Sequence, residues 1–268
     1  MPKRLAFRLL ILLLQITMAS TVLTFSLVAT GKAEDARTIR IAVEGAFPPF
    51  NYLDSNKQLQ GFDVDIANAL CEIKGLKCEL VVQEWTGMIP ELLDDKFDAI
   101  ISSMSMSEER RQKVLFTTRY YDSPSIFIAK KDDQSKYADH TQINGIRLGV
   151  TASTSQEAYA KSKLKDVELV VFPASPDLYK GLAEGEVDVI LEDKLAIYDW
   201  LANTKAGSCC SFVGSDIKDA KFFGDGAGIA VRPDDKPLAD TLGKALTEIQ
   251  SNGTYDMINA KYFPFSIR

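Results

Sequence analysis

Short apolar strands and amphipathic helices alternate twice along this chain, and this alternation restricts the fold more than any other feature. The first run predicts strands at 39–43, 79–82 and 97–101, with helices at 62–73 and 88–93. The second run starts after Gly145 and predicts strands at 146–150, 167–172 and 187–191, with helices at 155–164 and 176–183. Each β-α-β-α-β run indicates a mainly parallel sheet flanked by helices. We therefore expect an α/β protein with two lobes.

Two extended segments are expected to connect the lobes. Residues 119–131 lead from the first lobe to the second, and residues 222–228 lead back. A strand at 229–231 and helices at 237–251 and 254–262 then complete the first lobe. This predicts lobe 1 at 34–122 and 225–268, lobe 2 at 123–224, and a two-strand hinge between them.

The N-terminal segment has the pattern of a secretory signal peptide. Lys3, Arg4 and Arg8 precede an apolar stretch, and small residues around Ala33 are suited to cleavage after it. The alternative is an uncleaved membrane anchor at 9–30, which polar residues within that stretch make less favourable. We predict that residues 1–33 are a signal peptide and that the protein is exported.

The charge of the chain excludes some partners. Removing residues 1–33 would take away four positive charges and no acid, so the formal charge would change from −6 to −10. Such an acidic protein is a poor match for nucleic acid or for an anionic membrane surface.

Four cysteines are present. Cys71 and Cys78 lie between a predicted helix and the next strand, and in an exported protein this spacing predicts a local disulfide. Cys209 and Cys210 are adjacent, and the sequence leaves open free thiols, a redox function or an intermolecular bond. The single histidine, His140, is remote from these cysteines and from the polar strand ends, so we predict no metal, no cofactor and no histidine-based catalytic pair.

Residues 98–110 predict one side of a binding site. A buried strand ends in Ser102, Ser103 and Ser105, and Arg110 follows. Ligands of open α/β sheets bind at the carboxyl ends of strands, and a guanidinium can hold a carboxylate through two hydrogen bonds. The alternative for Arg110 is a surface ion pair with Glu108 or Glu109.

The second lobe offers matching groups at its own strand ends. Thr151, Ser155 and Gln156 lie where a strand passes into a helix, and the first N–H groups of that helix could bind the same carboxylate. Asp193 follows another strand and could accept an ammonium group, although a helix N-cap is the simpler interpretation.

A further set of residues could distinguish between side chains. Glu44 ends the first strand and could accept a cationic head group, while Phe47 and Trp85 could enclose its aliphatic stem. Ordinary core packing is the alternative for both aromatic residues.

The chain resembles the bacterial periplasmic binding proteins for polar amino acids, in particular those for histidine, for lysine, arginine and ornithine, and for opines. The resemblance covers about 38–265 and is carried by Gly61-Phe-Asp-Val-Asp-Ile66, Asp98-Ala-Ile-Ile-Ser-Ser-Met-Ser105 with Arg110, Gly149-Val150 with Ser155-Gln156-Glu157, and Gly253-Thr254-Tyr255. It implies that Arg110 and Ser155 hold the ligand carboxylate, and that Ser103, Ser105 and Asp193 hold its ammonium group. It also implies the Cys71–Cys78 disulfide, a periplasmic location and delivery to a membrane ABC permease.

The sequence thus predicts a monomeric transport receptor, not an enzyme, for a polar and cationic amino acid. Cystine or another uncharged amino acid is an alternative ligand, because Thr151 and Trp85 depart from the histidine-type pattern. A dehydratase of the cyclohexadienyl type is the enzyme alternative, with Glu44 or Asp193 as general acid. We disfavour the sensor module of a receptor, because no further segment follows Arg268.

Overall fold

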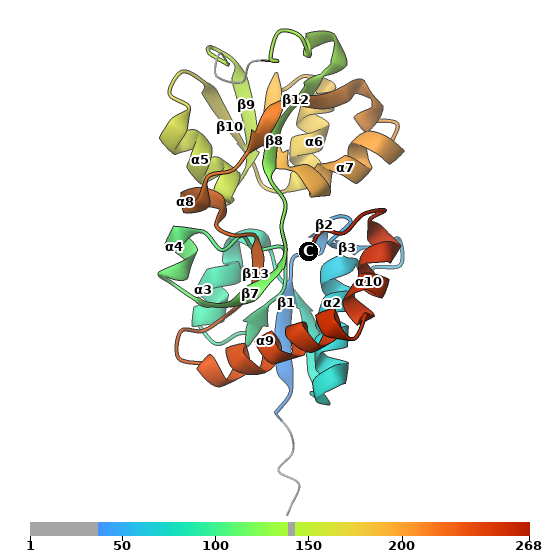
Figure 1. Ribbon diagram of the computed structural model, residues 1–268. Helices are drawn as coiled ribbons and strands as arrows, with labels where there is room; N and C mark the ends of the chain where they lie inside the picture. The colour runs from blue at the N-terminus through green and yellow to red at the C-terminus, as the bar shows by residue number, and fades with distance from the viewer. Residues whose placement is uncertain (1–36, 139–142) are drawn as a thin grey trace, which may run out of the picture. The chain divides into compact units, whose positions relative to one another are not determined.

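The computed structural model describes residues 37–138 and 143–268. The predicted signal peptide and His140 lie outside the described residues. Two five-stranded sheets organise this part of the chain, and they define the two lobes (Figure 1). Within the described residues, no helix combines the length and apolar character that a membrane span requires.

Lobe 1 is built on the first sheet, in the order β5-β1-β6-β13-β7. Its strands are β1 (Ile39–Val43), β5 (Cys78–Val82), β6 (Ala99–Ile100), β7 (Leu115–Tyr121) and β13 (Ala227–Val231). Its helices are α2 (Phe62–Lys74), the 3₁₀ helix η1 (Trp85–Gly87), α3 (Met88–Leu93), α4 (Glu108–Arg111), α9 (Lys236–Ser251) and α10 (Thr254–Tyr262). A small antiparallel sheet joins β2 (Ala46–Phe47), β3 (Asn51–Leu53) and β4 (Leu59–Gln60).

Lobe 2 repeats this plan in the order β10-β9-β11-β8-β12. Its strands are β8 (Ser125–Lys130), β9 (Arg147–Thr151), β10 (Glu168–Phe172), β11 (Val189–Asp193) and β12 (Cys210–Ile217). Its helices are η2 (Lys131–Asp133), α5 (Ser155–Lys163), α6 (Ser175–Glu184), α7 (Lys194–Asn203), η4 (Gly207–Cys209) and α8 (Ala220–Phe223). The elements α4, α7, α8, β12 and the small sheet are additions to the sequence prediction.

The pairings explain why each sheet is mainly parallel without being wholly so. The first three strands in each order pair in parallel, and the fourth strand pairs antiparallel with both of its neighbours. These reversed strands are β13 and β8, and each one enters its sheet directly from the other lobe. The reversal follows from the chain path, because a strand arriving at the hinge side runs away from the carboxyl ends of the parallel strands.

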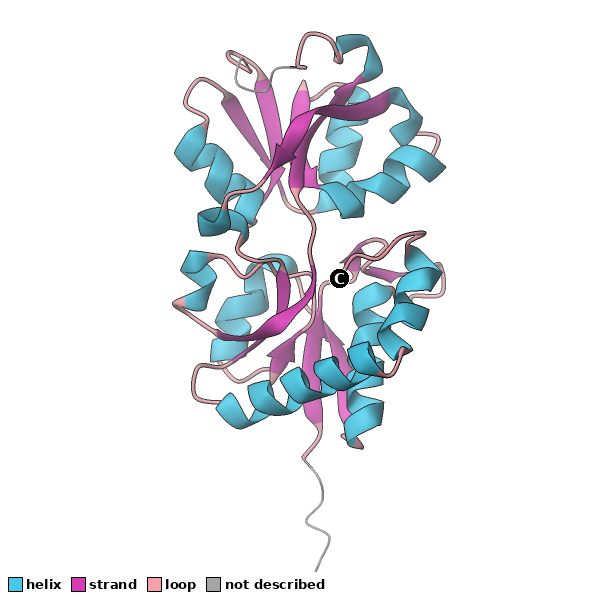
Figure 2. Ribbon diagram, viewed as in Figure 1, coloured by secondary structure: helices cyan, strands magenta, loops and turns pink. Residues whose placement is uncertain are grey.

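Both faces of each sheet are buried by helices (Figure 2). In lobe 1, Ile41 packs into one apolar cluster with α2 and α9, and the next residue, Ala42, packs into another with α3. In lobe 2, the neighbouring residues Leu191 and Ile190 likewise pack into two different apolar clusters, one on each face of the sheet. Alternate side chains of a strand point to opposite faces, so a sheet covered on both sides needs continuous apolar strands.

The crossings between the lobes are short. Three residues separate β7 from β8, and Gly224 and Gly226 lie on the return path between α8 and β13. Both glycines have positive φ angles, 66° and 116°, and a Cβ on either one would meet a backbone oxygen at 2.2 Å or 2.5 Å. Glycine is therefore required at both positions.

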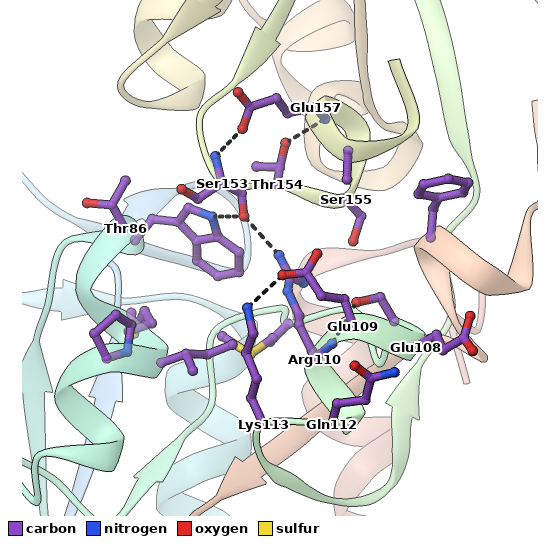
Figure 3. Close-up of a pocket in the computed structure, with 18 of the residues that line it drawn as sticks. Thr86, Glu108, Glu109, Arg110, Gln112, Lys113, Ser153, Thr154, Ser155 and Glu157 are labelled. Carbon is purple, nitrogen blue, oxygen red and sulfur yellow. Dashed lines mark hydrogen bonds and ion pairs between the residues drawn. The ribbon is translucent and has the colours of Figure 1, made fainter. Parts of the chain in front are cut away.

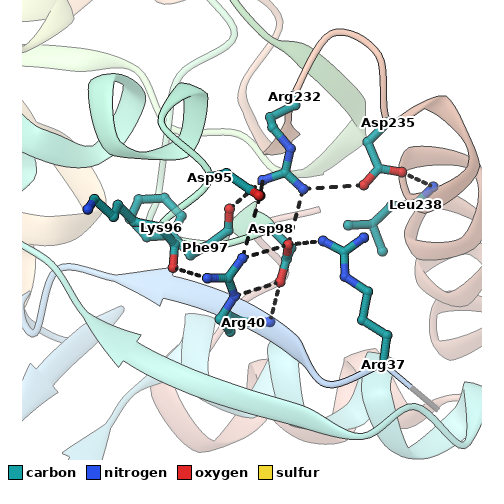
Figure 4. Close-up of polar contacts among 9 residues, drawn as sticks. All are labelled: Arg37, Arg40, Asp95, Lys96, Phe97, Asp98, Arg232, Asp235 and Leu238. Carbon is teal, nitrogen blue, oxygen red and sulfur yellow. Dashed lines mark hydrogen bonds and ion pairs between the residues drawn. The ribbon is translucent and has the colours of Figure 1, made fainter. Parts of the chain in front are cut away.

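An arginine–aspartate cluster closes lobe 1 at the end of the sheet away from the strand carboxyl ends (Figure 4). Asp98 is fully buried and forms ion pairs with Arg37, Arg40 and Arg232. Burial by itself would raise the pKa of Asp98, but the hydrogen bonds from Arg40 and Arg232 outweigh it and hold the pKa well below its usual range. The cluster connects the first strand to the segment that returns from lobe 2.

Each lobe contains one disulfide. The predicted bond between Cys71 and Cys78 is present and joins α2 to β5. Cys209 and Cys210 are bonded to each other, at the junction of η4 and β12. The structure thus answers the question that the sequence left open for this pair.

Candidate functional site

A small cavity lies at the carboxyl ends of the strands, with a lining drawn from both lobes. Its volume is about 40 Å³. Lobe 1 contributes Glu44, Phe47, Trp85, Ser102, Ser103, Ser105 and Arg110, and lobe 2 contributes Thr151, Thr154, Ser155, Gln156, Ser175, Glu192 and Asp193. All eleven residues that the sequence analysis selected are in this lining, and their role as ligand contacts stays a prediction.

Arg110 is a buried cation at this cavity. It lies on α4, and its guanidinium donates to the carbonyl oxygens of Ser105 at 3.1 Å and Ser153 at 3.1 Å. It also stacks over the Trp85 ring at 5.0 Å from the ring centroid. The described part of the chain places no carboxylate in ion-pair contact with it, so the predicted alternative of an ion pair with Glu108 or Glu109 is wrong. Burial lowers the pKa of Arg110 to about 10.

A larger groove, with a volume of about 1060 Å³, borders the cavity and shares Trp85, Arg110, Thr154 and Ser155 with it, while Ser153 lines the groove only (Figure 3). The carbonyl oxygen of Ser153 accepts hydrogen bonds from both Arg110 and the Trp85 indole, at 3.1 Å and 3.2 Å. Ser153 itself has a positive φ of 58°. This turn therefore brings the start of α5 in lobe 2 against the arginine of lobe 1.

The start of α5 offers hydrogen-bond donors beside Arg110. Thr154 is the N-cap, and its hydroxyl accepts from the Glu157 N–H at 3.2 Å. The hydroxyl of Ser155 is buried and finds no partner among the described residues. The first N–H groups of any α-helix lack intrahelical acceptors. A carboxylate placed here would meet a guanidinium, an unpaired hydroxyl and a helix N-terminus.

Asp193 serves as a helix cap and also lines the cavity. Its Oδ1 accepts from the N–H groups of Leu195 and Ala196 and from the hydroxyl of Ser123, at 2.9, 3.0 and 2.7 Å. Within the described residues, these side-chain contacts all fall on Oδ1, which leaves Oδ2 for a ligand. Burial raises the pKa of Asp193 to about 6, so a cation beside it would be strongly favoured.

The serines after β6 have different tasks. Ser102 accepts a hydrogen bond from the Glu44 N–H at 3.0 Å, so its hydroxyl hydrogen remains available. Ser103 donates to Asp63 at 2.9 Å, so only its lone pairs remain, and they suit an ammonium group. The carbonyl of Ser105 helps to position Arg110, as described above.

Asp63 is a residue that sequence reasoning left unassigned. It is fully buried at the start of α2, and it accepts hydrogen bonds from Asn51, Ser103 and Tyr120 at 2.8, 2.9 and 2.8 Å. The backbone N–H of Ser103 in turn donates to Tyr120 at 2.9 Å. The network holds Ser103 in place. The sequence feature that could have pointed to Asp63 is an acidic residue within the Gly61-Phe-Asp motif.

Glu44 and Phe47 form a wall of the cavity in lobe 1. Burial, followed by the nearby charge of Asp63, raises the pKa of Glu44 to about 7. Phe47 stacks on Phe50 with ring centroids 5.7 Å apart, and it also packs against the apolar cluster of lobe 1. Phe47 thus serves both the core and the cavity.

Glu192 and Ser175 form the facing wall in lobe 2, and sequence reasoning missed both. The Glu192 Oε1 accepts from the Ser175 hydroxyl at 2.9 Å and from the Tyr179 hydroxyl at 3.1 Å. Ser175 also contacts the Thr151 hydroxyl at 3.3 Å. Gln156, predicted as a ligand contact, donates its amide to Ser125 at 3.0 Å. The sequence feature that could have pointed to Glu192 as a cavity residue is an acidic residue in a buried strand, directly before Asp193.

Comparison with known proteins places this chain in a family. The model of the bacterial extracellular solute-binding proteins, family 3, matches residues 39–265. An L-arginine-binding protein of Pseudomonas aeruginosa is 38% identical over 86% of this chain and 90% of its own length. The lysine/arginine/ornithine-binding periplasmic protein of Escherichia coli is 34% identical over 92% of this chain and 96% of its own.

A solved structure shows the same fold. The arginine-specific periplasmic binding protein STM4351 of Salmonella typhimurium superposes with a TM-score of 0.78 at 27% identity, over 85% of this chain and all (100%) of that one. The fold, the polar cavity at the strand ends and the family match agree, and the chain belongs to the bacterial extracellular solute-binding proteins, family 3.

Proposed function

We propose that this protein is the periplasmic receptor of an ABC importer and that it binds a cationic amino acid, arginine foremost, in the cavity between its lobes. The observation that carries the proposal is the charge of the lining. One buried arginine, Arg110, has no carboxylate partner among the described residues, while three carboxyl groups line the same cavity: Glu44, Glu192 and Asp193. A ligand with one carboxylate and two cationic groups complements this arrangement.

The proposed contacts follow from the geometry. The ligand carboxylate lies against Arg110, the Ser155 hydroxyl and the start of α5. The ammonium group lies between Asp193 and the lone pairs of Ser103. The side chain then extends toward Glu44, with its stem against Phe47 and Trp85. The names of the relatives, which specify arginine, lysine and ornithine, support a cationic side chain.

Binding requires the lining to move. A cavity of about 40 Å³ is much smaller than the roughly 300–1,000 Å³ of a typical small-molecule pocket. We infer that the lobes rotate about the two crossings to admit the ligand and close around it. The ligand favours the closed form because only that form brings Arg110 and Ser155 to it from opposite lobes.

Isothermal titration calorimetry of the purified protein tests this function. The panel is arginine, lysine, ornithine, histidine, glutamine, cystine and an opine. We expect arginine to bind most tightly and Arg110→Ala to weaken that binding by about 2–5 kcal/mol, because a buried charge pair is lost. Arg111→Ala is the matched control, since Arg111 is on the same helix but half-exposed and paired with Asp225.

Two results would contradict the proposal. Tight binding of glutamine or cystine together with failure of all four cationic amino acids would remove Glu44 as the selective group. Near-normal arginine affinity in Arg110→Ala would remove Arg110 from the site.

The dehydratase remains a second candidate because the cavity contains carboxyl groups that hold protons near neutral pH. Burial raises the pKa of Glu192 to about 8, a value suited to a general acid. A cyclohexadienyl substrate should nevertheless be recovered unchanged after incubation with the protein. Formation of an aromatic product, followed by ultraviolet absorbance, would assign the enzyme function instead.

A further inference from the structure

Glu192 is a buried carboxyl group that the contacts proposed above leave without a role. It lies on β11, and its side chain is turned to the cavity beside Ser175, the first residue of α6. The residue is 2% exposed. Burying a carboxyl group is costly unless it is paired, so its presence needs a reason.

Within residues 37–138 and 143–268, the surroundings of Glu192 do not supply a cation. Its side-chain hydrogen bonds come from two neutral hydroxyl groups, those of Ser175 and Tyr179, and both reach Oε1. Among the described residues, no lysine or arginine forms an ion pair with it. Burial raises its pKa to about 8. Asp98 differs, because this buried carboxylate forms ion pairs with three arginines of the protein itself.

A purely structural role would not require an acid here. The amide oxygen of glutamine could accept the same two hydrogen bonds from Ser175 and Tyr179. What the carboxyl group adds is a second oxygen and the capacity for negative charge at a cavity wall. A cation delivered by the ligand would use both.

The position of Glu192 fits the far end of the ligand. Helix α6, which begins with Ser175, contacts β2 of lobe 1, and β2 carries Phe47 and starts two residues after Glu44. Arg110 is associated with different elements, the turn at Ser153 and the indole of Trp85. The contact between α6 and β2 therefore brings the Glu192 wall next to the Glu44 wall, whereas Arg110 is held by other elements.

We propose that Glu192, held by Ser175, is a second specificity-determining residue that binds the distal cation of the ligand from lobe 2 while Glu44 binds it from lobe 1. A planar guanidinium has five N–H donors in a fork and can serve two carboxylates at once, whereas an ammonium group is a compact charge with three donors. Two carboxyl groups from opposite walls thus select arginine, or an opine that keeps its guanidinium, over lysine and ornithine. This inference rests on the proposed function.

The test is the amide variant Glu192→Gln, titrated with arginine, ornithine and glutamine at pH 8. We expect arginine affinity to fall at least tenfold, ornithine affinity to fall less, and any glutamine affinity to stay within threefold. The melting temperature of the free variant should equal or exceed that of the parent, because an uncharged amide replaces a buried acid. Glu186→Gln is the matched control, since Glu186 is exposed and three residues from β11.

The outcomes separate the two proposals. Arginine affinity within threefold of the parent in Glu192→Gln overturns this inference alone, and so does a parallel loss for all ligands with a lowered melting temperature. Failure of the parent protein to bind any cationic amino acid overturns the proposed function as well. Ser175→Ala gives an independent check, because it should weaken arginine more than ornithine while Glu192 is still present.

Discussion

The two lobes anchor β1 and β9, the strands that begin the two β-α-β-α-β runs, with the same kind of arginine–aspartate pair, but they bury it to different degrees. In lobe 1, the backbone N–H of Arg40 donates to Asp98 at 2.9 Å, and its guanidinium reaches both oxygens of the same carboxylate at 3.1 Å. In lobe 2, Arg147 makes the same three contacts with Asp188, at 2.8, 3.3 and 2.7 Å. The repeat that the sequence indicates thus extends to side-chain hydrogen bonds.

The difference lies in what else reaches the carboxylate. Asp98 also pairs with Arg37 and Arg232, and its side chain is fully buried, whereas the Asp188 side chain is 33% exposed. Arg232 follows β13, which returns from lobe 2. Lobe 1 is made of two separate stretches of chain, and its cluster ties them together. Lobe 2 is one continuous stretch and needs only the local pair.

Replacing each aspartate measures this difference most directly. We expect Asp98→Ala to lower the free energy of unfolding by about 3 kcal/mol, because the fully buried carboxylate that pairs with three arginines is removed and the largely buried Arg232 loses one of its partners. Asp188→Ala should cost about 1 kcal/mol or less, because solvent screens a partly exposed pair. Denaturant titration followed by circular dichroism gives both values. Equal costs would show that the additional arginines of lobe 1 contribute nothing.

The disulfides provide a second comparison, with a smaller expected effect. Cys71 and Cys78 are separated by 7 residues, and closing such a loop stabilises a protein by about 2–3 kcal/mol in the chain-entropy model. Cys209 and Cys210 have a separation of 1, so their bond removes little freedom from the unfolded chain. The double serine variant of the first pair should therefore lower the melting temperature more than that of the second. The reverse order would refute the entropic argument.

The cavity carboxyl groups Glu44 and Glu192 should change the stability of the protein with pH in the opposite direction to Asp98 and Asp188, the carboxyl groups that anchor β1 and β9. The anchor pKa values are lowered, so their stabilisation is lost as the pH falls below about 4. The pKa values of Glu44 and Glu192 are raised to about 7 and 8. The folded protein then holds more protons than the unfolded chain between about pH 4.5 and 8, and the stability of the free protein falls as the pH rises through this window.

The pH dependence of ligand affinity is the smallest effect predicted in this comparison. A bound cation favours the ionised carboxylate, so arginine affinity should rise with pH, by about fivefold between pH 6 and 7 for a single group with a pKa near 7. Calorimetry at the two pH values measures it, and Glu44→Gln should show a weaker rise. An affinity that falls over this interval would mean that the carboxyl groups bind the ligand in their protonated form.

Much of the fold was predictable from local pattern. The continuous apolar strands indicated sheets covered on both faces, and the structure has them at nearly the predicted residues, with α10 at Thr254–Tyr262 as expected. Helix α7 is one of the elements that the sequence analysis did not predict. The helix follows its N-cap Asp193, which the sequence suggested both as an N-cap and as a ligand group, and the N-cap contacts use Oδ1 and leave Oδ2 for the proposed ligand.

The sequence by itself determined the two α/β runs, the polar strand ends, the Cys71–Cys78 bond and the identity of eleven cavity-lining residues, because strand periodicity and strand-end chemistry are local properties. Only the tertiary structure decided that Arg110 lacks a carboxylate partner among the described residues, that Asp63 fixes Ser103, and that Glu192 faces the cavity. These facts depend on which groups from distant segments meet, and on how completely their packing excludes water. No spacing along the chain encodes them.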